Sequence, residues 1–307
     1  MRYLVIGAGG TGGSIAAYMN EAGKDVEVIA RGKHLEAIKE NGLRMETPDR
    51  GSFVTKPIKA FDMENYSKRP DVIFVCLKGY SLDDAIPFMR RVSGPDTVVI
   101  PILNIYGTGG RMQEKLPGIL VTDGCIYIAA EISEPGTIVK KSDGIKVVFG
   151  ARKADENRDV LQTVKKDLEE SGIIAVLSDN ITRDTLQKFG FISPFAACGA
   201  YHDVPAGEFQ KEGEIRDMFT ALTKEILSIS EAMGIVFETD LVKSNLTFID
   251  SLSPSASASM QRDLKKGGDS EIDGLVFEVV RMGRKYGVDV PVYEKVSEKF
   301  GYRIREK

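Results

Sequence analysis

The sequence has few of the residues that build disulfide frameworks, metal centres and histidine-based catalytic sites. Its 307 residues include three cysteines, Cys76, Cys125 and Cys198, and two histidines, His34 and His202. Three widely spaced cysteines form neither a disulfide framework nor a metal-ligand cluster. Because each cysteine stands among apolar or small residues, we expect buried free thiols, and we expect no metal site.

The sequence also lacks a long apolar run and a strong excess of charge. The first apolar run, Tyr3 to Ile6, is short and leads into glycines, unlike a signal peptide. No stretch approaches the roughly 20 apolar residues of a membrane helix. Lys plus Arg number 41 and Asp plus Glu number 45, a net charge of −4, which does not indicate a nucleic-acid or membrane partner. We therefore expect a reduced, soluble, cytoplasmic protein.

The first part of the chain shows the alternation of an α/β fold. Short runs rich in Val and Ile alternate with helix-like segments and indicate strands buried on both faces of a parallel sheet. Residues 136–141 and 145–150 are expected to be further strands near the end of this sheet. An amphipathic helix at 156–172 and a last strand at 173–179 complete this part. The main expected strands are residues 3–7, 25–31, 71–78 and 97–104.

From Asn180 onward the pattern is helical. Apolar residues recur at spacings of three and four, which places them on one face of each helix. We therefore predict an α/β domain over residues 1–179 and an all-α C-terminal domain over residues 180–307. The apolar faces comprise Ile215, Phe219, Leu222, Ile226 and Ile229 in one helix, and Ile272, Leu275, Val276, Val279 and Met282 in another.

A cluster of glycines follows the first expected strand. Gly7, Gly9 and Gly12 form the pattern G-x-G-x-x-G between a strand and a helix. The first glycine allows a tight turn, the second lets the backbone approach a pyrophosphate, and the third lets the helix pack closely on the strand. Backbone N–H groups and the helix dipole then face the phosphates. We expect a Rossmann-type domain that binds a dinucleotide here, with Gly10 and Thr11 also contributing; the alternative is a structural turn.

The second strand ends in a base rather than an acid. Asp or Glu at this position binds the ribose hydroxyls of NAD, whereas Arg31 can pair with a 2′-phosphate and stack on adenine. The sequence therefore predicts NADPH/NADP as the cofactor, with Lys33 or His34 as candidates to assist. The alternative is a solvated surface arginine.

Several short segments together resemble a known family. The glycine loop, "AR" followed by "HLEAIKENGL", "VCLKGY" at a strand end, and "LQKF", "SMQRD" and "EIDGLV" in the second half match the ketopantoate reductase family in order and spacing. The resemblance covers nearly the whole chain. It implies an NADPH-dependent 2-oxo acid reductase, similar to 2-dehydropantoate 2-reductase of pantothenate biosynthesis. It also implies that the substrate is bound in a cleft between a Rossmann domain and a helical domain.

The resemblance implies roles for particular residues. Lys188 matches the catalytic lysine, Glu271 the substrate-binding glutamate, and Ser259 the serine that holds the substrate carboxylate. Lys78 matches a lysine at the end of a main strand and is expected to bind the cofactor. Without the resemblance, Lys188 would be a surface lysine, Glu271 a first-turn acid and Ser259 a cap or loop serine.

The chemistry expected of Lys188 follows from hydride transfer to a ketone, which leaves negative charge on the oxygen. A nearby ammonium stabilises that charge and delivers the proton as a general acid. Lys188 lies in an otherwise apolar segment, where partial desolvation would lower its pKa toward a useful range. Asp263 and Asp273 are expected to be caps or surface acids, although either could orient Lys188.

The sequence departs from the family pattern at two places. The family usually carries N-G-x-G after the fifth main strand, where the asparagine contacts cofactor and substrate; here Asn104 is present but Ile105 replaces the glycine. As an alternative, Asn104 is a turn residue. Two substrate-binding asparagines of better-known members are replaced by Ile192 and Ala196. A site without hydrogen-bonding groups loses their discrimination, so the 2-oxo acid stays open and is expected to be more apolar than ketopantoate.

Two other functions stay open on the sequence. A different two-domain NADP-dependent dehydrogenase, of the hydroxyacid or opine type, would need a catalytic histidine or an acid–base pair. His34 is remote from the expected nicotinamide, and His202 is expected to lie in a loop. A non-catalytic NADPH-binding redox sensor is the other alternative. The oligomeric state is also open, with a homodimer among the alternatives.

Overall fold

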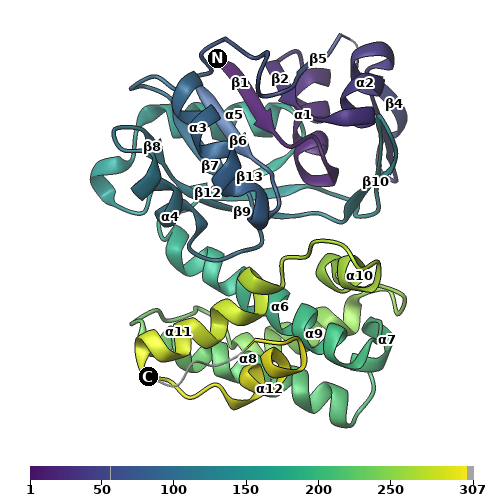
Figure 1. The fold of residues 1–307 in the computed structure, drawn as a ribbon, viewed down its shortest axis with the longest axis vertical. Coiled ribbons are helices and arrows are strands. Elements are labelled where there is room, and N and C mark those ends of the chain that lie inside the picture. Colours follow the sequence, from purple (N-terminus) through teal and green to yellow (C-terminus); the bar gives the residue numbers. More distant parts are fainter. Residues whose placement is uncertain (56, 303–307) are drawn as a thin grey trace. The chain divides into compact units, whose positions relative to one another are not determined.

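The computed structural model describes residues 1–55 and 57–302, which divide into two compact units (Figure 1). The first unit comprises Met1–Leu103 and Gly107–Thr185, and the second comprises Asn104–Tyr106 and Leu186–Lys307. Helix α6 (Ile181–His202) therefore begins in the first unit and continues in the second. The short segment Asn104–Tyr106 belongs to the second unit although the chain on both sides of it belongs to the first.

The first unit is built on a six-stranded sheet in which all neighbouring strands are parallel. Tyr3 and Val5 of the central strand pack in one core, and Leu4 and Ile6 pack in another. Burial of both faces explains the continuous apolar runs and confirms the predicted parallel sheet. In spatial order the strands are β5 (Lys59–Phe61), β2 (Asp25–Ile29), β1 (Arg2–Ile6), β6 (Val72–Val75), β7 (Val98–Pro101) and β8 (Leu120–Val121). The helices of this unit are α1 (Gly10–Glu21), α2 (Gly32–Asn41), α3 (Leu82–Val92), α4 (Thr108–Lys115) and α5 (Asp159–Glu170).

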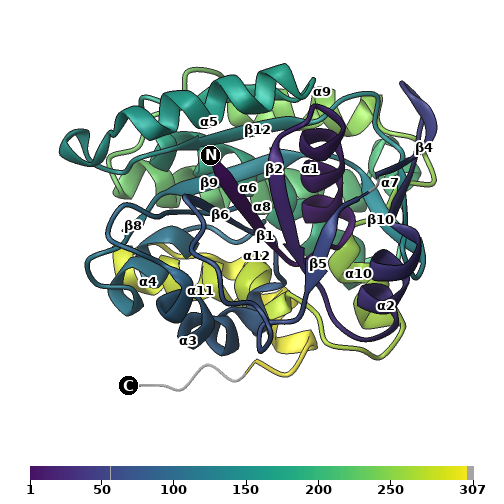
Figure 2. The same cartoon turned by 90° about the horizontal axis from the view of Figure 1, so that it is seen from above.

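Two smaller sheets complete the first unit. Residues 136–141 and 145–150 do not extend the main sheet, and that prediction is wrong: they lie in separate sheets. Burial alternates along β3 (Leu43–Thr47), as in a sheet with one face packed on the core, and β11 (Thr137–Lys140) pairs with β3 instead of with the main sheet. Helix α5 packs on the three-stranded sheet (Figure 2). The orders are β10 (Ala130–Glu134), β11 (Thr137–Lys140), β3 (Leu43–Thr47), β4 (Gly51–Thr55), and β13 (Ile174–Leu177), β12 (Lys146–Gly150), β9 (Asp123–Tyr127).

Polar contacts anchor helix α1, which follows the glycine loop. The hydroxyl of Tyr18 donates to Asp49 at 3.1 Å, and Asp49 also pairs at 2.7 Å with the ammonium of Lys140, which is fully buried. Burial, followed by the hydrogen bond to Asp49, raises the pKa of Tyr18 to about 12. The tyrosine therefore stays neutral and ties the far part of α1 to the β3–β4 turn.

The second unit is helical, and the predicted all-α domain is confirmed. Four of the five apolar residues predicted for one face of α8 are fully buried, and the fifth is half-buried. Asp240 caps α9 by accepting the backbone N–H of Lys243 at 3.0 Å. A π-helical turn, Asp273–Phe277, precedes α11. The remaining helices are α7 (Ala206–Phe209), α8 (Glu214–Ala232), α9 (Leu241–Ser251), α10 (Ser259–Lys265), α11 (Glu278–Tyr286) and α12 (Pro291–Lys299).

The three cysteines form no disulfide within the described residues. Cys125 and Cys198 are buried as expected, whereas Cys76 is only half-buried. Burial raises the pKa of Cys198 to about 12 and also raises that of Cys76, which keeps both thiols protonated at neutral pH. None of the helices in residues 1–55 and 57–302 has the length and apolar character needed to span a bilayer.

Candidate functional site

The glycine loop between β1 and α1 has the backbone geometry that its sequence predicts. Gly7 has a φ of +95°, which L-residues rarely adopt, and a Cβ there would lie 2.7 Å from the carbonyl oxygen of Cys76. The N–H groups of Gly7 and Ala8 donate to the carbonyl of Ile29 at 3.0 and 3.2 Å. The turn is therefore tight and is fixed to the end of β2.

The two other motif glycines serve different purposes. A Cβ on Gly12 would lie 2.2 Å from the carbonyl oxygen of Gly7 and 2.9 Å from Cγ1 of Val5, so only glycine allows α1 to pack this closely on β1. A Cβ on Gly9 would meet no atom within 4 Å. The backbone at Gly9 is therefore open to a ligand at the N-terminus of the 12-residue helix α1, and a pyrophosphate fits the residues present.

Gly10 has a second reason to be glycine, which the sequence interpretation missed. A Cβ there would lie 2.4 Å from the carbonyl oxygen of Ala130 in β10. Gly13 is similarly close to Cδ1 of Ile138 in β11, at 2.1 Å. The loop and first turn of α1 thus pack directly on the β10–β11 hairpin. Thr11, the other predicted cofactor contact, is half-buried in the same first turn.

Arg31 and Lys78 follow strands that flank β1. Arg31 is exposed just after β2, at the N-cap of α2, and Lys78 is half-buried after β6, at the start of the 3₁₀ turn Gly79–Ser81. Since β2, β1 and β6 are adjacent and parallel, their carboxyl ends meet at one edge of the sheet. Ligands of doubly wound folds bind at that edge.

Both histidines are engaged in contacts within the protein. His34 bonds through both ring nitrogens to backbone atoms of Ala8 and Gly136, so the structure does not support its predicted assistance to Arg31. His202 is the last residue of α6, with Nε2 3.2 Å from the sulfur of Met218; its predicted position in a loop is wrong.

The second unit brings two of the predicted residues together. Lys188, on α6, is only 7% exposed, and its Nζ donates to Oδ1 of Asn104 at 2.8 Å. The ring of Tyr106 lies 6.1 Å from that of Phe189, which helps hold the segment Asn104–Tyr106 against α6. The hydrogen bond to Asn104 fixes one direction in which the buried ammonium of Lys188 donates.

Glu271 lies at the start of an irregular helix. The side chain is 5% exposed, and the π-helical turn begins two residues later. A Cβ on Gly274 in that turn would lie 2.4 Å from Cδ1 of Ile105. The isoleucine that replaces the family glycine is therefore accommodated by close packing on Gly274, which links the Asn104 segment to the helix of Glu271.

A buried pair of hydroxyls supports the same π-helical turn. Ser193 Oγ, on α6, donates to the carbonyl of Leu275 at 2.5 Å and lies 2.6 Å from the hydroxyl of Tyr293. Sequence reasoning missed Ser193, because a single serine in an apolar helix carries no pattern. The glycine inside the apolar helical pattern at 274 is the signal that could have indicated the close approach.

The other predicted site residues are placed as follows. Ser259 is the half-buried first residue of α10, and its predicted substrate contact stays a prediction. Asp273 is paired with Arg281 at 2.9 Å, as a surface acid. Ile192 is half-buried and Ala196 fully buried in the core of the second unit, so the positions of the family asparagines are apolar.

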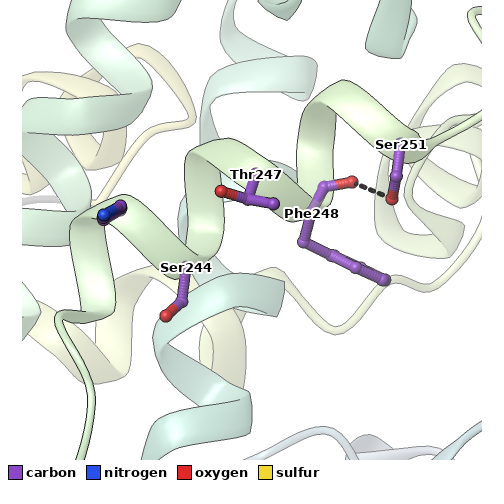
Figure 3. A pocket seen from close by; sticks show the side chains of 5 residues that line it. Ser244, Thr247, Phe248 and Ser251 are labelled. Atoms are coloured by element: carbon purple, nitrogen blue, oxygen red, sulfur yellow. Dashed lines mark hydrogen bonds between the residues drawn. The ribbon is translucent and has the colours of Figure 1, made fainter.

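A separate hollow lies along α9 and contains none of the predicted site residues. It has a volume of about 460 Å³ and is lined by Lys243, Ser244, Thr247, Phe248 and Ser251. Figure 3 shows these side chains along α9, with the Ser251 hydroxyl bonded to the carbonyl of Phe248 at 2.7 Å. None of these five lining residues is an acid or a histidine.

The chain is similar to known proteins over nearly its whole length. Residues 3–154 match the family described as "Ketopantoate reductase PanE/ApbA", and residues 180–301 match its C-terminal part. A curated relative, "Uncharacterized oxidoreductase YkpB" of Bacillus subtilis, is 27% identical over 302 residues, covering 96% of each chain. A solved 2-dehydropantoate 2-reductase from Porphyromonas gingivalis is 28% identical with a TM-score of 0.83, covering 98% of this chain and 99% of that one. A D-mandelate dehydrogenase structure is 22% identical with a TM-score of 0.88, covering 97% and 96%.

The Rossmann-type unit with its glycine loop, followed by a helical unit, is the architecture of a class of two-domain oxidoreductases. Within this class, the models of one family match both parts of the chain, residues 3–154 and 180–301. The chain belongs to the ketopantoate reductase family.

Proposed function

We propose that the chain uses NADPH to reduce a small 2-oxo acid to the 2-hydroxy acid, with ketopantoate or a close relative as the substrate. The observation that carries this proposal is the buried Lys188, whose ammonium is held by Asn104 at 2.8 Å. A buried and oriented cation is suited to stabilise charge that develops on a carbonyl oxygen. Family membership supports the class of reaction.

The glycine loop supports a dinucleotide cofactor. The open backbone at Gly9 and the N-terminus of α1 would hold the pyrophosphate. Arg31, exposed at the end of β2, would pair with the 2′-phosphate that distinguishes NADPH from NADH, and Lys78 at the end of β6 would contact the cofactor from the neighbouring strand. When bound, the nicotinamide supplies the hydride.

The proposed role of Lys188 is that of general acid. An ammonium has three N–H donors, and the bond to Asn104 fixes the direction of one of them. As the new C–H bond forms, the carbonyl oxygen gains negative charge, and Lys188 gives it a proton. The lysine is left as a neutral amine and regains its proton from solvent before the next turnover.

The proposed substrate contacts are Ser259 for the carboxylate and Glu271 for the far end of the substrate. Ile192 and Ala196 offer no hydrogen bonds to that far end, so we propose a substrate with a more apolar chain than ketopantoate. The solved D-mandelate dehydrogenase is described with NADH and anilino(oxo)acetate. That description makes aryl-substituted 2-oxo acids a relevant part of a substrate panel.

Steady-state oxidation of NADPH with a panel of 2-oxo acids tests the proposal. The panel contains ketopantoate, branched aliphatic 2-oxo acids and an aryl 2-oxo acid, with matched ketones that lack the carboxylate as controls. We expect turnover of at least one 2-oxo acid, little turnover of the ketones and a preference for NADPH over NADH. Tight NADPH binding without turnover of any member would favour a redox sensor and would overturn the catalytic proposal.

A further inference from the structure

The imidazole of His34 joins the glycine loop to a hairpin from another sheet. Nε2 lies 2.7 Å from the carbonyl oxygen of Ala8, inside the loop. Nδ1 lies 3.0 Å from the backbone nitrogen of Gly136, in the turn between β10 and β11. The side chain comes from the first turns of α2, so one residue connects three separate segments of the first unit.

The chemistry of these two partners fixes the form of the ring. A backbone carbonyl can only accept and a backbone N–H can only donate. Nδ1 must therefore be unprotonated to accept from Gly136, and Nε2 must carry the proton to donate to Ala8. The contacts require the neutral Nε2–H tautomer of His34, and a side chain that serves both backbone groups in this way is not available to bind a phosphate.

The bond to Ala8 also sets the direction of a neighbouring donor. The peptide between Ala8 and Gly9 is planar and trans, so its C=O and N–H groups point in opposite directions. When His34 holds the carbonyl on one side, the N–H of Gly9 is directed to the other. Gly9 is the position where the loop is open, because a Cβ there would meet no atom within 4 Å.

The hairpin turn that His34 contacts is itself held in place by neighbouring elements. The carbonyl of Gly136 accepts the N–H of Arg44 in β3 at 2.9 Å, and a Cβ on Gly136 would lie 3.0 Å from Cβ of Ala37 in α2. The hairpin also contacts the loop directly, at Gly10 and Ala130. The turn that His34 bonds is therefore held by a sheet and a helix.

We propose that His34 is a positioning residue for the cofactor, which orients the Ala8–Gly9 peptide so that the Gly9 N–H faces the pyrophosphate. The proposal rests on the proposed function, because it assumes that a nicotinamide dinucleotide binds at the glycine loop. It differs from the role of Arg31 in one measurable respect. NADPH and NADH share the pyrophosphate, so loss of His34 weakens both, whereas Arg31 concerns only the 2′-phosphate.

The test compares dissociation constants for NADPH and NADH across four variants by cofactor fluorescence. We expect His34→Ala to weaken both by about three- to tenfold, the range that follows from losing one neutral hydrogen bond, with their ratio unchanged. His34→Gln retains an amide donor for Ala8 and should recover most of the affinity. His34→Asn can place its amide oxygen near the position of Nδ1, to accept from Gly136, but its shorter side chain does not reach the position of Nε2, and it should not recover the affinity. Glu36→Ala, an exposed change on the same helix, is the control and should bind as wild type.

Different failures have different meanings. Unchanged affinities in His34→Ala and His34→Asn, with only a lower melting temperature, would show a structural role and overturn the proposal. Loss of NADPH affinity alone would show that His34 acts on the 2′-phosphate, which also overturns it. Wild-type protein that binds neither nucleotide would overturn the proposed function and this inference together. Binding of NADH but not NADPH would overturn only the NADPH assignment.

Discussion

The two units form their candidate sites from different kinds of groups, backbone in one and side chains in the other. In the first unit the site is mostly backbone: a turn at Gly7, an open approach at Gly9 and close helix packing at Gly12. In the second unit it is made of side chains, with the ammonium of Lys188 held by the amide of Asn104. A site made of backbone is disturbed when a substitution adds atoms, whereas a site made of side chains is disturbed when a substitution removes them. We therefore expect glycine-to-alanine changes to damage the first unit and loss of a side-chain group to damage the site of the second.

The largest expected effect is the removal of the ammonium in the second unit. Lys188→Met should lower kcat by about 10²–10⁴-fold, the usual contribution of positioned proton transfer, and leave the dissociation constant of NADPH nearly unchanged. Lys188→Arg should not restore kcat, because a guanidinium does not release its proton at working pH. Lys224→Met, the same change at an exposed position of α8, is the matched control. Near-normal kcat in Lys188→Met would end the catalytic assignment.

Two glycine-to-alanine changes test the backbone character of the first unit. Gly12→Ala would place a Cβ 2.2 Å from the carbonyl oxygen of Gly7. It should lower the free energy of unfolding by about 1–3 kcal/mol, the usual cost of overpacking. Gly9→Ala meets open space at a φ of −74°, and should leave stability unchanged while weakening NADPH. Urea unfolding and NADPH titration of both variants give the comparison. Equal losses of stability would contradict it.

Arg31 is the side chain of the first unit that is chiefly expected to distinguish NADPH from NADH. Arg31→Ala should weaken NADPH by about 1.5–3 kcal/mol, the value of a hydrogen bond to a charged group, and barely change NADH. Titration of both nucleotides into wild type and variant measures this difference. A wild-type preference for NADH, or an equal loss for both nucleotides, would contradict the NADPH assignment.

The smallest expected effect concerns a buried carboxylate in the second unit. Glu225 accepts the N–H groups of Val292 and Tyr293, at 2.7 and 3.0 Å, where α12 begins. Burial raises the pKa of Glu225 and outweighs these two bonds, which lower it. A raised folded-state pKa contributes stability below the ordinary value of 4.5, and this contribution is lost as the pH rises through the folded-state pKa.

The stability of wild type relative to Glu225→Gln should therefore fall as the pH increases from about 4.5 towards neutrality. Urea unfolding at a series of pH values measures it. Parallel curves for the two proteins would show that Glu225 does not titrate with folding.

The contrast between the units also explains how much the sequence could predict. The glycine loop is a local pattern, so the sequence alone predicts the turn at Gly7, the open position at Gly9 and the close packing at Gly12. Four strands of the parallel sheet, β1, β2, β6 and β7, could be predicted from continuous apolar runs, whereas the short edge strands β5 and β8 were not predicted. The separate sheet of β10, β11, β3 and β4 could not be predicted, because the pairing of β11 with β3 joins segments far apart in the chain and leaves no local signal. The close packing of Gly10 on Ala130 of β10 was missed for the same reason.

The side-chain site depended on the family resemblance. Nothing in the spacing of Asn104 and Lys188 shows that they meet, because the contact needs a three-residue segment of the first half of the chain to join the helical unit. The packing of Ile105 on Gly274 likewise joins distant positions. The roles of Ser259 and Glu271, the interdomain cleft and homodimerisation stay predictions.

The π-helical turn after Glu271 has a consequence for how such a site can change in evolution. A π turn holds one residue more than the α-helix around it, so deleting one residue within Asp273–Phe277 would restore α-helical geometry. The wider π turn absorbs this extra residue locally, so the residues on both sides of Asp273–Phe277 would keep nearly the same faces after the deletion. The core face of α11, with Val279 and Met282, and the face that carries Glu271 would both be kept, while the π turn itself would be lost. Gain or loss of a single codon at this turn is therefore a change in length that the helix absorbs locally, without altering the faces it presents on either side.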